Sequence, residues 1–286
     1  MVHQTAQSVS RHARVRAGFS IVDLLVSLAV MSLLIAMLLP SLGRAREAGF
    51  RTASASNIRQ QGIGLQMFAY DARGKLPTSV FASNNTRGVD APEQMVFLRV
   101  DLGDAVAATG RGAPASNTTF SWDGLGRLFN REYLSTGEVF YNPSHDDVHV
   151  YDRYAPFFNG ESGAIVCNYQ YRWDAKTPTI DRVRHQTTLI ADAMRSQPEY
   201  NHRTGNNMLK GDLSVSWFSD TGGTLFDSLA PEAPMVAETE YSDLVILSRS
   251  GVINAWELLD DTKQADTTAA ASVNDPLNAF FNINFE

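Results

Sequence analysis

Residues 19–39, FSIVDLLVSLAVMSLLIAMLL, determine the architecture of this chain, because Asp23 is their only charged residue. At a helical rise of about 1.5 Å per residue the stretch is about 31 Å long, close to the bilayer's hydrocarbon thickness of about 30 Å. The apolar part of a secretory signal is shorter, about 7–15 residues, and a small-residue cleavage site follows it. Here the stretch runs into the charged sequence LGRAREAG at 42–49. We therefore predict a membrane helix with no cleavage behind it.

The charges in front of this stretch predict its orientation. Arg11, Arg14 and Arg16 lie among the first eighteen residues, which contain no acidic residue. Basic flanks stay on the cytoplasmic side of a membrane, so the amino terminus should be cytoplasmic and everything after Pro40 extracytoplasmic. Pro40 itself lacks the amide hydrogen that a helix needs, so we expect it to kink or end the helix, at a cost of about 3 kcal/mol.

Asp23 is the one charge inside the apolar stretch. A carboxylate costs up to about 2.5–3.5 kcal/mol at the centre of a membrane helix unless it is paired. Cleavage between Gly18 and Phe19 would create a free α-amine four residues before it. The amine of a neighbouring subunit could then neutralise Asp23 as helices stack side by side. We therefore predict an assembly role for Asp23.

The segment RAGFSIVDLLVSLAVMSLLIAMLLPSLGRAREA, residues 16–48, resembles the amino-terminal signature of type IV pilins and type II secretion pseudopilins. The resemblance implies cleavage after Gly18 by a prepilin peptidase, methylation of the new terminus at Phe19, and a helix-stacking role for the acid five residues into the mature chain. The family usually has glutamate where this chain has Asp23. The shorter side chain favours a minor or initiating subunit. Helices of this family often bend or melt at a proline comparable to Pro40.

Beyond Pro40 the apolar residues keep a broadly helical spacing, and Gly62 and Gly64 should weaken that helix. Gly74 and Pro77 predict its end near residues 70–71. We expect an α+β, pilin-like fold in which the second half of a long helix packs on a domain with an antiparallel sheet. The predicted segments are the leader 1–18, the transmembrane helix 19–39, the amphipathic continuation 40–71 and the extracytoplasmic globular domain 72–286.

Alternating or continuous apolar runs predict the strands of that domain. MVFLRVDLG at 95–103 is typical of an edge or core strand, and TTLIADAMRS at 187–196 of a buried strand that ends in acids. NNMLKGDLSVSWFSD at 206–220 predicts a hairpin with its turn at Gly211-Asp212. The tail LNAFFNINFE, 277–286, either adds an edge strand or stays loose.

Two further blocks resemble the large prepilin-like paralogue families of planctomycete-type bacteria. The first begins FSWDGLGRLFNREYL at residue 120 and ends in Asn142-Pro143, where those families typically have Cys-Pro. The second is their carboxy-terminal mark, a histidine, nine residues and then Asp-Gly. His202 and Asp212 have this spacing, but Leu213 replaces the glycine, which suggests a turn shifted by one residue. The resemblance implies no catalytic role for this mark.

Charge and cysteine content exclude several classes of function. The formal charge is −7, and it is −10 without the three arginines of the leader, so the domain should repel phosphate backbones. No basic stripe with interleaved aromatic residues reverses this, and nucleic acid is not an expected partner. Cys167 is the only cysteine, so neither an intrachain disulfide nor a zinc cluster is available. Asp146 and Asp147 are weak calcium candidates in an acidic loop.

The strongest enzymatic hypothesis would combine Asp192, His202, Asp212 and His185 as a metal or acid–base cluster. No HExxH, GxSxG or Gly-rich phosphate motif accompanies them, and they do not have the spacing of ligands on one helix. We expect polar loop and turn residues instead, and therefore a chain without an active site, cofactor or resident metal.

These observations predict a non-enzymatic structural subunit of a type IV pilus-like or type II secretion assembly, held in the inner membrane by one helix. Its expected partners are the prepilin peptidase and other pilin or pseudopilin subunits. The alternative is a signal-anchored extracytoplasmic domain with its own ligand-binding or hydrolytic activity. Only the first hypothesis requires cleavage after Gly18 and depends on Asp23.

Overall fold

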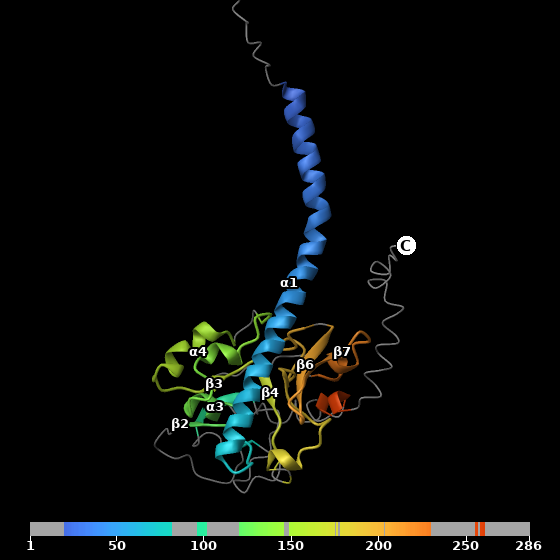
Figure 1. Ribbon diagram of the computed structural model, residues 1–286. Helices are drawn as coiled ribbons and strands as arrows, with labels where there is room; N and C mark the ends of the chain where they lie inside the picture. The colour runs from blue at the N-terminus through green and yellow to red at the C-terminus, as the bar shows by residue number, and fades with distance from the viewer. Residues whose placement is uncertain are drawn as a thin grey trace, which may run out of the picture. The chain divides into compact units, whose positions relative to one another are not determined.

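The computed structural model describes residues 20–81, 96–101, 120–145, 149–174, 176, 178–202, 204–229, 255–256 and 258–260. The chain divides into two compact units, residues 1–46 and 47–286. The elements are α1 (Ile21–Asp71), β1 (Phe97–Asp101), β2 (Phe120–Trp122), α3 (Gly126–Asn130), the 3-10 turn η2 (Gly137–Phe140), α4 (Tyr151–Phe158), β3 (Ile165–Val166), β4 (Tyr169–Tyr171), the 3-10 turn η3 (Ile180–Arg182), β5 (Thr188–Asp192), β6 (Gly205–Lys210), β7 (Val215–Ser219) and α5 (Thr224–Ser228) (Figure 1). Gly18, Phe19, Asp146, Asp147 and the tail 277–286 lie outside the described residues.

Helix α1 is a single element of 51 residues, and Pro40 lies inside it. The expectation that Pro40 could end the helix is wrong, because a proline removes one backbone hydrogen bond while the apolar residues on both sides favour helix. The hydroxyl of Ser41 donates to the carbonyl of Leu38 (2.8 Å), one turn back along the same helix. The helix ends at Asp71, within the predicted range, and Gly74 follows with a φ of 84°.

The strands form two antiparallel sheets instead of the one that the sequence predicted. The first has the order β2-β1-β3 and the second the order β4-β5-β6-β7. Strand β1 is the centre of the first sheet, so the 95–103 segment contains a core strand. Strand β5 is buried along its whole length, and β6 pairs with β7 as the predicted hairpin. Together with α1 these sheets make an α+β layout.

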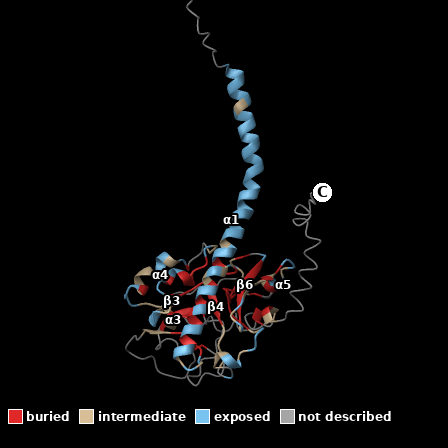
Figure 2. Ribbon diagram, in the orientation of Figure 1, coloured by how far each residue is buried: buried red, intermediate tan, exposed pale blue. Residues whose placement is uncertain are grey.

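The second half of α1 packs in the main hydrophobic core through Ile58, Leu65 and Phe68 (Figure 2). Gly62 and Gly64 have a packing role there that the sequence did not indicate. A Cβ on Gly62 would lie 2.8 Å from a methyl carbon of Leu209, so its absence allows close contact with β6. The helical cost of about 1 kcal/mol per glycine is therefore offset by closer packing.

The turn between β6 and β7 differs from the shifted turn suggested by the order Gly211-Asp212. The amide of Leu213 donates to the carbonyl of Lys210 (2.8 Å), and Leu213 itself has a φ of 63°. This is the left-handed position of a three-residue hairpin loop, where glycine is usual. Gly211 serves another purpose, since a Cβ on it would lie 2.2 Å from the carbonyl oxygen of Arg184.

Candidate functional site

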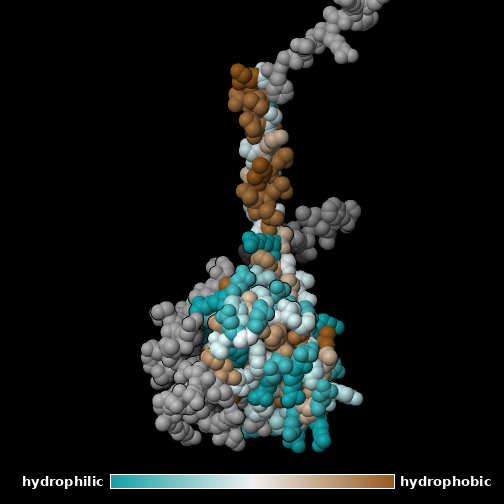
Figure 3. Space-filling model, turned by 90° about the vertical axis from the view of Figure 1, so that its left-hand side faces the viewer, coloured by the Kyte–Doolittle hydropathy of each residue, from teal (hydrophilic) through white to brown (hydrophobic). Residues whose placement is uncertain are grey.

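The first half of α1 presents an apolar surface on all sides. Every Val, Leu, Ile and Met side chain between Ile21 and Leu42 is at least half exposed. Brown side chains cover this part of the helix in Figure 3. It is long and apolar enough to cross a membrane. An exposed apolar surface of this extent is typical of a membrane or protein contact.

Asp23 lies in the first turn of this helix and is exposed. Its Oδ2 accepts a long hydrogen bond from the amide of Ser20 (3.3 Å), and it makes no ion pair within the described part of the chain. The amino-terminal end of a helix favours a negative charge. The negative charge of Asp23 therefore lies at the end of the helix where the helix dipole favours it.

The second unit contains a polar network that joins α1 to the larger sheet and is buried except at Glu47. We call it the polar clasp and define it by five residues: Glu47, Ser54, Asn142, Asp192 and His202. Asp192, at the end of β5, is 1% exposed and lies at its centre. Its Oδ1 accepts hydrogen bonds from the hydroxyl of Ser54 (2.6 Å) and from Nδ2 of Asn142 (2.8 Å).

The other side of Asp192 faces strand β6 and His202. Its Oδ2 accepts a hydrogen bond from the amide of Asn207 (2.7 Å) and lies 3.8 Å from Nε2 of His202. Burial raises the pKa of Asp192, and the nearby His202 and the hydrogen bond from Ser54 oppose that rise. The carboxylate therefore stays in a dry site only because several donors surround it.

His202 contacts Glu47, the residue of α1 at which the second unit of the chain begins. It is completely buried, and its Nδ1 lies 2.6 Å from Oε1 of Glu47. Its Nε2 lies 3.3 Å from Nδ2 of Asn142. The ring therefore lies between two carboxylates, that of Glu47 on the Nδ1 side and that of Asp192 on the Nε2 side.

Further polar contacts continue the docking along α1. Nδ2 of Asn57 donates to the carbonyl of Tyr141 (3.0 Å), and Nε2 of Gln61 donates to that of Val139 (2.9 Å). The guanidinium of Arg51 lies over the indole of Trp217 on β7, 3.5 Å from the ring centre. Polar contacts therefore alternate with the core contact of Ile58 along this stretch of α1.

The structure separates the four residues of the enzymatic hypothesis. Asp192 and His202 come together, whereas Asp212 lies exposed at the hairpin turn and accepts hydrogen bonds from the amide (2.9 Å) and hydroxyl (2.6 Å) of Ser214. His185 is likewise exposed. Within the described ranges no group of three or more His, Cys, Asp or Glu side chains is arranged to hold a metal ion. Asp192 and His202 form one buried contact, and Asp212 stabilises one turn.

Sequence reasoning missed the parts that Glu47 and Ser54 play, but it contained one usable signal. Asn142 and His202 belong to the two blocks that resemble prepilin-like paralogues, and the structure brings their side chains into contact. Cys167 is buried, and burial raises the pKa of its thiol to about 12. It is an inert packing residue at neutral pH.

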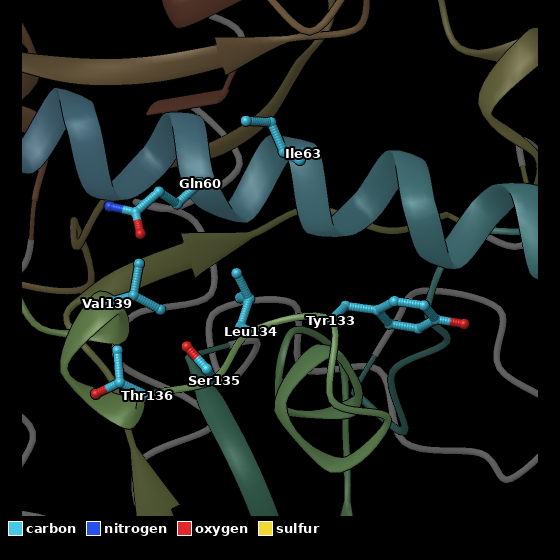
Figure 4. Close-up of a pocket in the computed structure, with 7 residues that line it drawn as sticks. All are labelled: Gln60, Ile63, Tyr133, Leu134, Ser135, Thr136 and Val139. Atoms are coloured by element: carbon cyan, nitrogen blue, oxygen red, sulfur yellow. The ribbon is translucent and has the colours of Figure 1, made fainter.

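A recess of about 180 Å³ lies between α1 and the segment that leads to η2 (Figure 4). Gln60 and Ile63 of the helix form one wall, and the residues from Tyr133 to Thr136, with Val139, form the other. Tyr133 is its only titratable lining residue, and its hydroxyl donates to Oδ2 of Asp71 (2.5 Å). This recess offers contacts but no pair of groups for acid–base chemistry.

No model of a known protein family matches the chain, and no curated protein and no solved structure matches it either.

Proposed function

We propose that this chain is a non-enzymatic structural subunit of a type IV pilus-like or type II secretion assembly. Its leader is removed after Gly18 by a prepilin peptidase, and the new terminus at Phe19 is methylated. The observation that carries the proposal is the exposed apolar surface of residues 21–42 in α1, in which Asp23 is the only charge. The chain resides in the inner membrane, with its amino terminus cytoplasmic and its domain extracytoplasmic.

The exposed apolar segment must be shielded from water both before and after assembly. Burial of apolar surface contributes roughly 25 cal/mol per Å², so a helix with all its Leu, Ile, Val and Met side chains in water is strongly disfavoured. Before assembly the bilayer supplies the cover. In the assembled state the helices of neighbouring subunits supply it, and Asp23 then pairs with a neighbour's terminal amine.

The serines within this segment support a lipid-facing or helix-facing environment. The hydroxyls of Ser27, Ser32 and Ser41 donate to carbonyls three or four residues back, at 2.8 to 3.0 Å. Each hydroxyl is thereby satisfied without water. Asp23 remains the only side chain of the segment that needs an external partner.

The first experiment is N-terminal and intact-mass analysis of the protein from its native membrane. A chain that begins at methylated Phe19 supports the proposal, whereas a chain that begins at Met1 contradicts it.

The second experiment compares Asp23→Ala with Asp23→Glu in an assembly assay. Asp23→Ala should reduce the assembled fraction by at least about tenfold, since a lost ion pair in a dry site exceeds about 1.4 kcal/mol. Asp23→Glu, which keeps the charge, should assemble at least as well as the wild type. Normal assembly of Asp23→Ala would refute the helix-stacking role.

The alternative is a signal-anchored domain whose function lies in ligand binding. One observation favours it, a cationic pocket in the second unit. Its lining contains four cationic and two acidic side chains. In that case cleavage after Gly18 and the charge of Asp23 would not affect the function of the domain. The Asp23→Ala variant therefore separates the two hypotheses.

A further inference from the structure

A pocket of about 350 Å³ lies where β4 ends and β5 begins. Arg172 and Trp173 follow β4 directly, and Arg182 and Arg184 come from η3 and the connection to β5. The pocket belongs entirely to the second unit. It shares no residue with the polar clasp or with the exposed segment of α1.

The charges around this pocket are unusual for an acidic domain. Its lining contains four cations, Arg172, Lys176, Arg182 and Arg184, against two carboxylates, so the lining has a net charge of +2. The whole chain has a formal charge of −7. The pocket is therefore a local cationic site on an otherwise acidic protein, and such a site attracts anions.

The carboxylates of the pocket are largely occupied by the protein itself. Asp260 accepts from Arg172 through Oδ2 (2.6 Å) and from the amide of Thr188 through Oδ1 (2.7 Å). Oδ1 of Asp174 accepts from the amide of Lys176 (2.8 Å). These contacts neutralise Arg172 and leave one oxygen of Asp174 available as an acceptor.

Three cations remain for a ligand. The side chains of Lys176, Arg182 and Arg184 are exposed, and they form no hydrogen bond or ion pair within the residues that the structure describes. A guanidinium binds a carboxylate or sulfate through two parallel hydrogen bonds, which makes arginine the preferred residue for such groups. The rim thus presents three exposed positive charges to an anionic ligand.

The remaining walls of the pocket are apolar and suit a ligand larger than a single ion. Leu76 and Leu189 are buried apolar residues, and Trp173 contributes its indole. The volume lies within the range of small-molecule sites and far exceeds the roughly 30 Å³ that one water occupies.

We propose that this pocket binds an acidic sugar unit. The Arg182 and Arg184 guanidinium groups hold its carboxylate or sulfate, and the ring packs on the indole of Trp173. The free oxygen of Asp174 and the hydroxyl of Thr187 pair with the sugar hydroxyls. A ligand rich in hydroxyls uses both the donors and the acceptors of this rim, whereas an aromatic acid would leave Asp174 without a donor. This site is additional to the proposed assembly function and does not depend on it.

The test is calorimetric titration of the full chain in a non-ionic detergent with D-glucuronate, glucose and inorganic sulfate. The wild type should bind glucuronate with a dissociation constant below about 10 mM and should bind glucose and sulfate at least about tenfold more weakly. The double variant Arg182→Gln, Arg184→Gln should lose at least about tenfold in affinity for glucuronate. Both side chains are exposed, so the fold should be unaffected.

The matched control is Arg44→Gln, Arg59→Gln, which removes the same charge from exposed positions of α1 outside the pocket. Its affinity for glucuronate should equal that of the wild type. Three results would overturn the proposal: no binding of glucuronate, equal losses in the two double variants, or sulfate binding as tightly as glucuronate. The last result would mean a general anion site without sugar recognition.

Discussion

Replacing Asp192 by alanine should destabilise the second unit more than any other single change in the polar clasp. Asp192 is 1% exposed and accepts three hydrogen bonds, from Ser54 (2.6 Å), Asn142 (2.8 Å) and the amide of Asn207 (2.7 Å). Alanine leaves the amide of Asn207 without its acceptor and removes the closest acceptor of Ser54 and Asn142, at about 1–3 kcal/mol each. Ser54 and Asn142 keep only longer contacts, of 3.1 to 3.3 Å. Removal of a buried charge, whose pKa is raised by burial, recovers part of that cost. We expect a net loss of about 3–5 kcal/mol in the free energy of unfolding.

Urea unfolding of the full chain in non-ionic detergent, followed by tryptophan fluorescence, measures this loss. Trp217 is a suitable reporter because its ring lies 5.7 Å from that of His202. Asp212→Ala is the matched control: it also removes one negative charge, but from an exposed turn, and should cost less than about 1 kcal/mol. A loss below about 1 kcal/mol for Asp192→Ala, or equal losses for the two variants, would refute the clasp as a source of stability.

Two further predictions concern the hairpin turn and the response to acid. Gly211→Ala should lower the free energy of unfolding by about 1–3 kcal/mol, because its Cβ would lie 2.2 Å from the carbonyl oxygen of Arg184. Leu213→Gly relieves a φ of 63° but removes a partly buried side chain that packs on the core, so it should lower the free energy of unfolding less than Gly211→Ala does. Thermal unfolding compares the two variants. Burial lowers the pKa of His149 to about 3 from 6.5, so the unfolded chain takes up the proton first. The free energy of unfolding therefore keeps its full value with respect to His149 above pH 6.5. It falls as the pH decreases toward 3, by up to about 5 kcal/mol. His149→Gln keeps an acceptor for the hydroxyl of Tyr154 and should flatten this part of the curve; an unchanged slope would contradict the assignment.

Local sequence patterns predicted the long helix and several of the strands. The apolar run after residue 19, the end of the helix at Asp71, the buried strand β5 and the hairpin β6–β7 all follow from periodicity and from turn residues. These signals lie within about 20 residues of the elements that they predict. The division into two sheets does not follow from such signals, because it depends on which strands pair at long range.

The polar clasp could not be predicted from the same patterns. Ser54 and Asp192 are 138 positions apart, and Glu47 and His202 are 155 apart. A serine and a glutamate on a helix usually face solvent, so their types alone do not indicate burial. The packing role of Gly62 was missed for a similar reason, because only the position of Leu209 shows that a Cβ would not fit. Contacts between residues so far apart in the sequence can be recognised only in the folded structure.

The wide separation of the clasp residues has a consequence for the order of folding. A ribosome delivers Glu47, Arg51 and Ser54 early. Their respective partners His202, Asn207 and Asp192 follow 138 to 156 positions later. Until those residues emerge, α1 can make only part of its native contacts, such as those with Val139, Tyr141 and Asn142. Contacts between distant residues slow folding because a long loop must close first. The last third of the chain therefore controls when the helix becomes locked to its domain, and a chain truncated before His202 should leave that face open to chaperones and proteases.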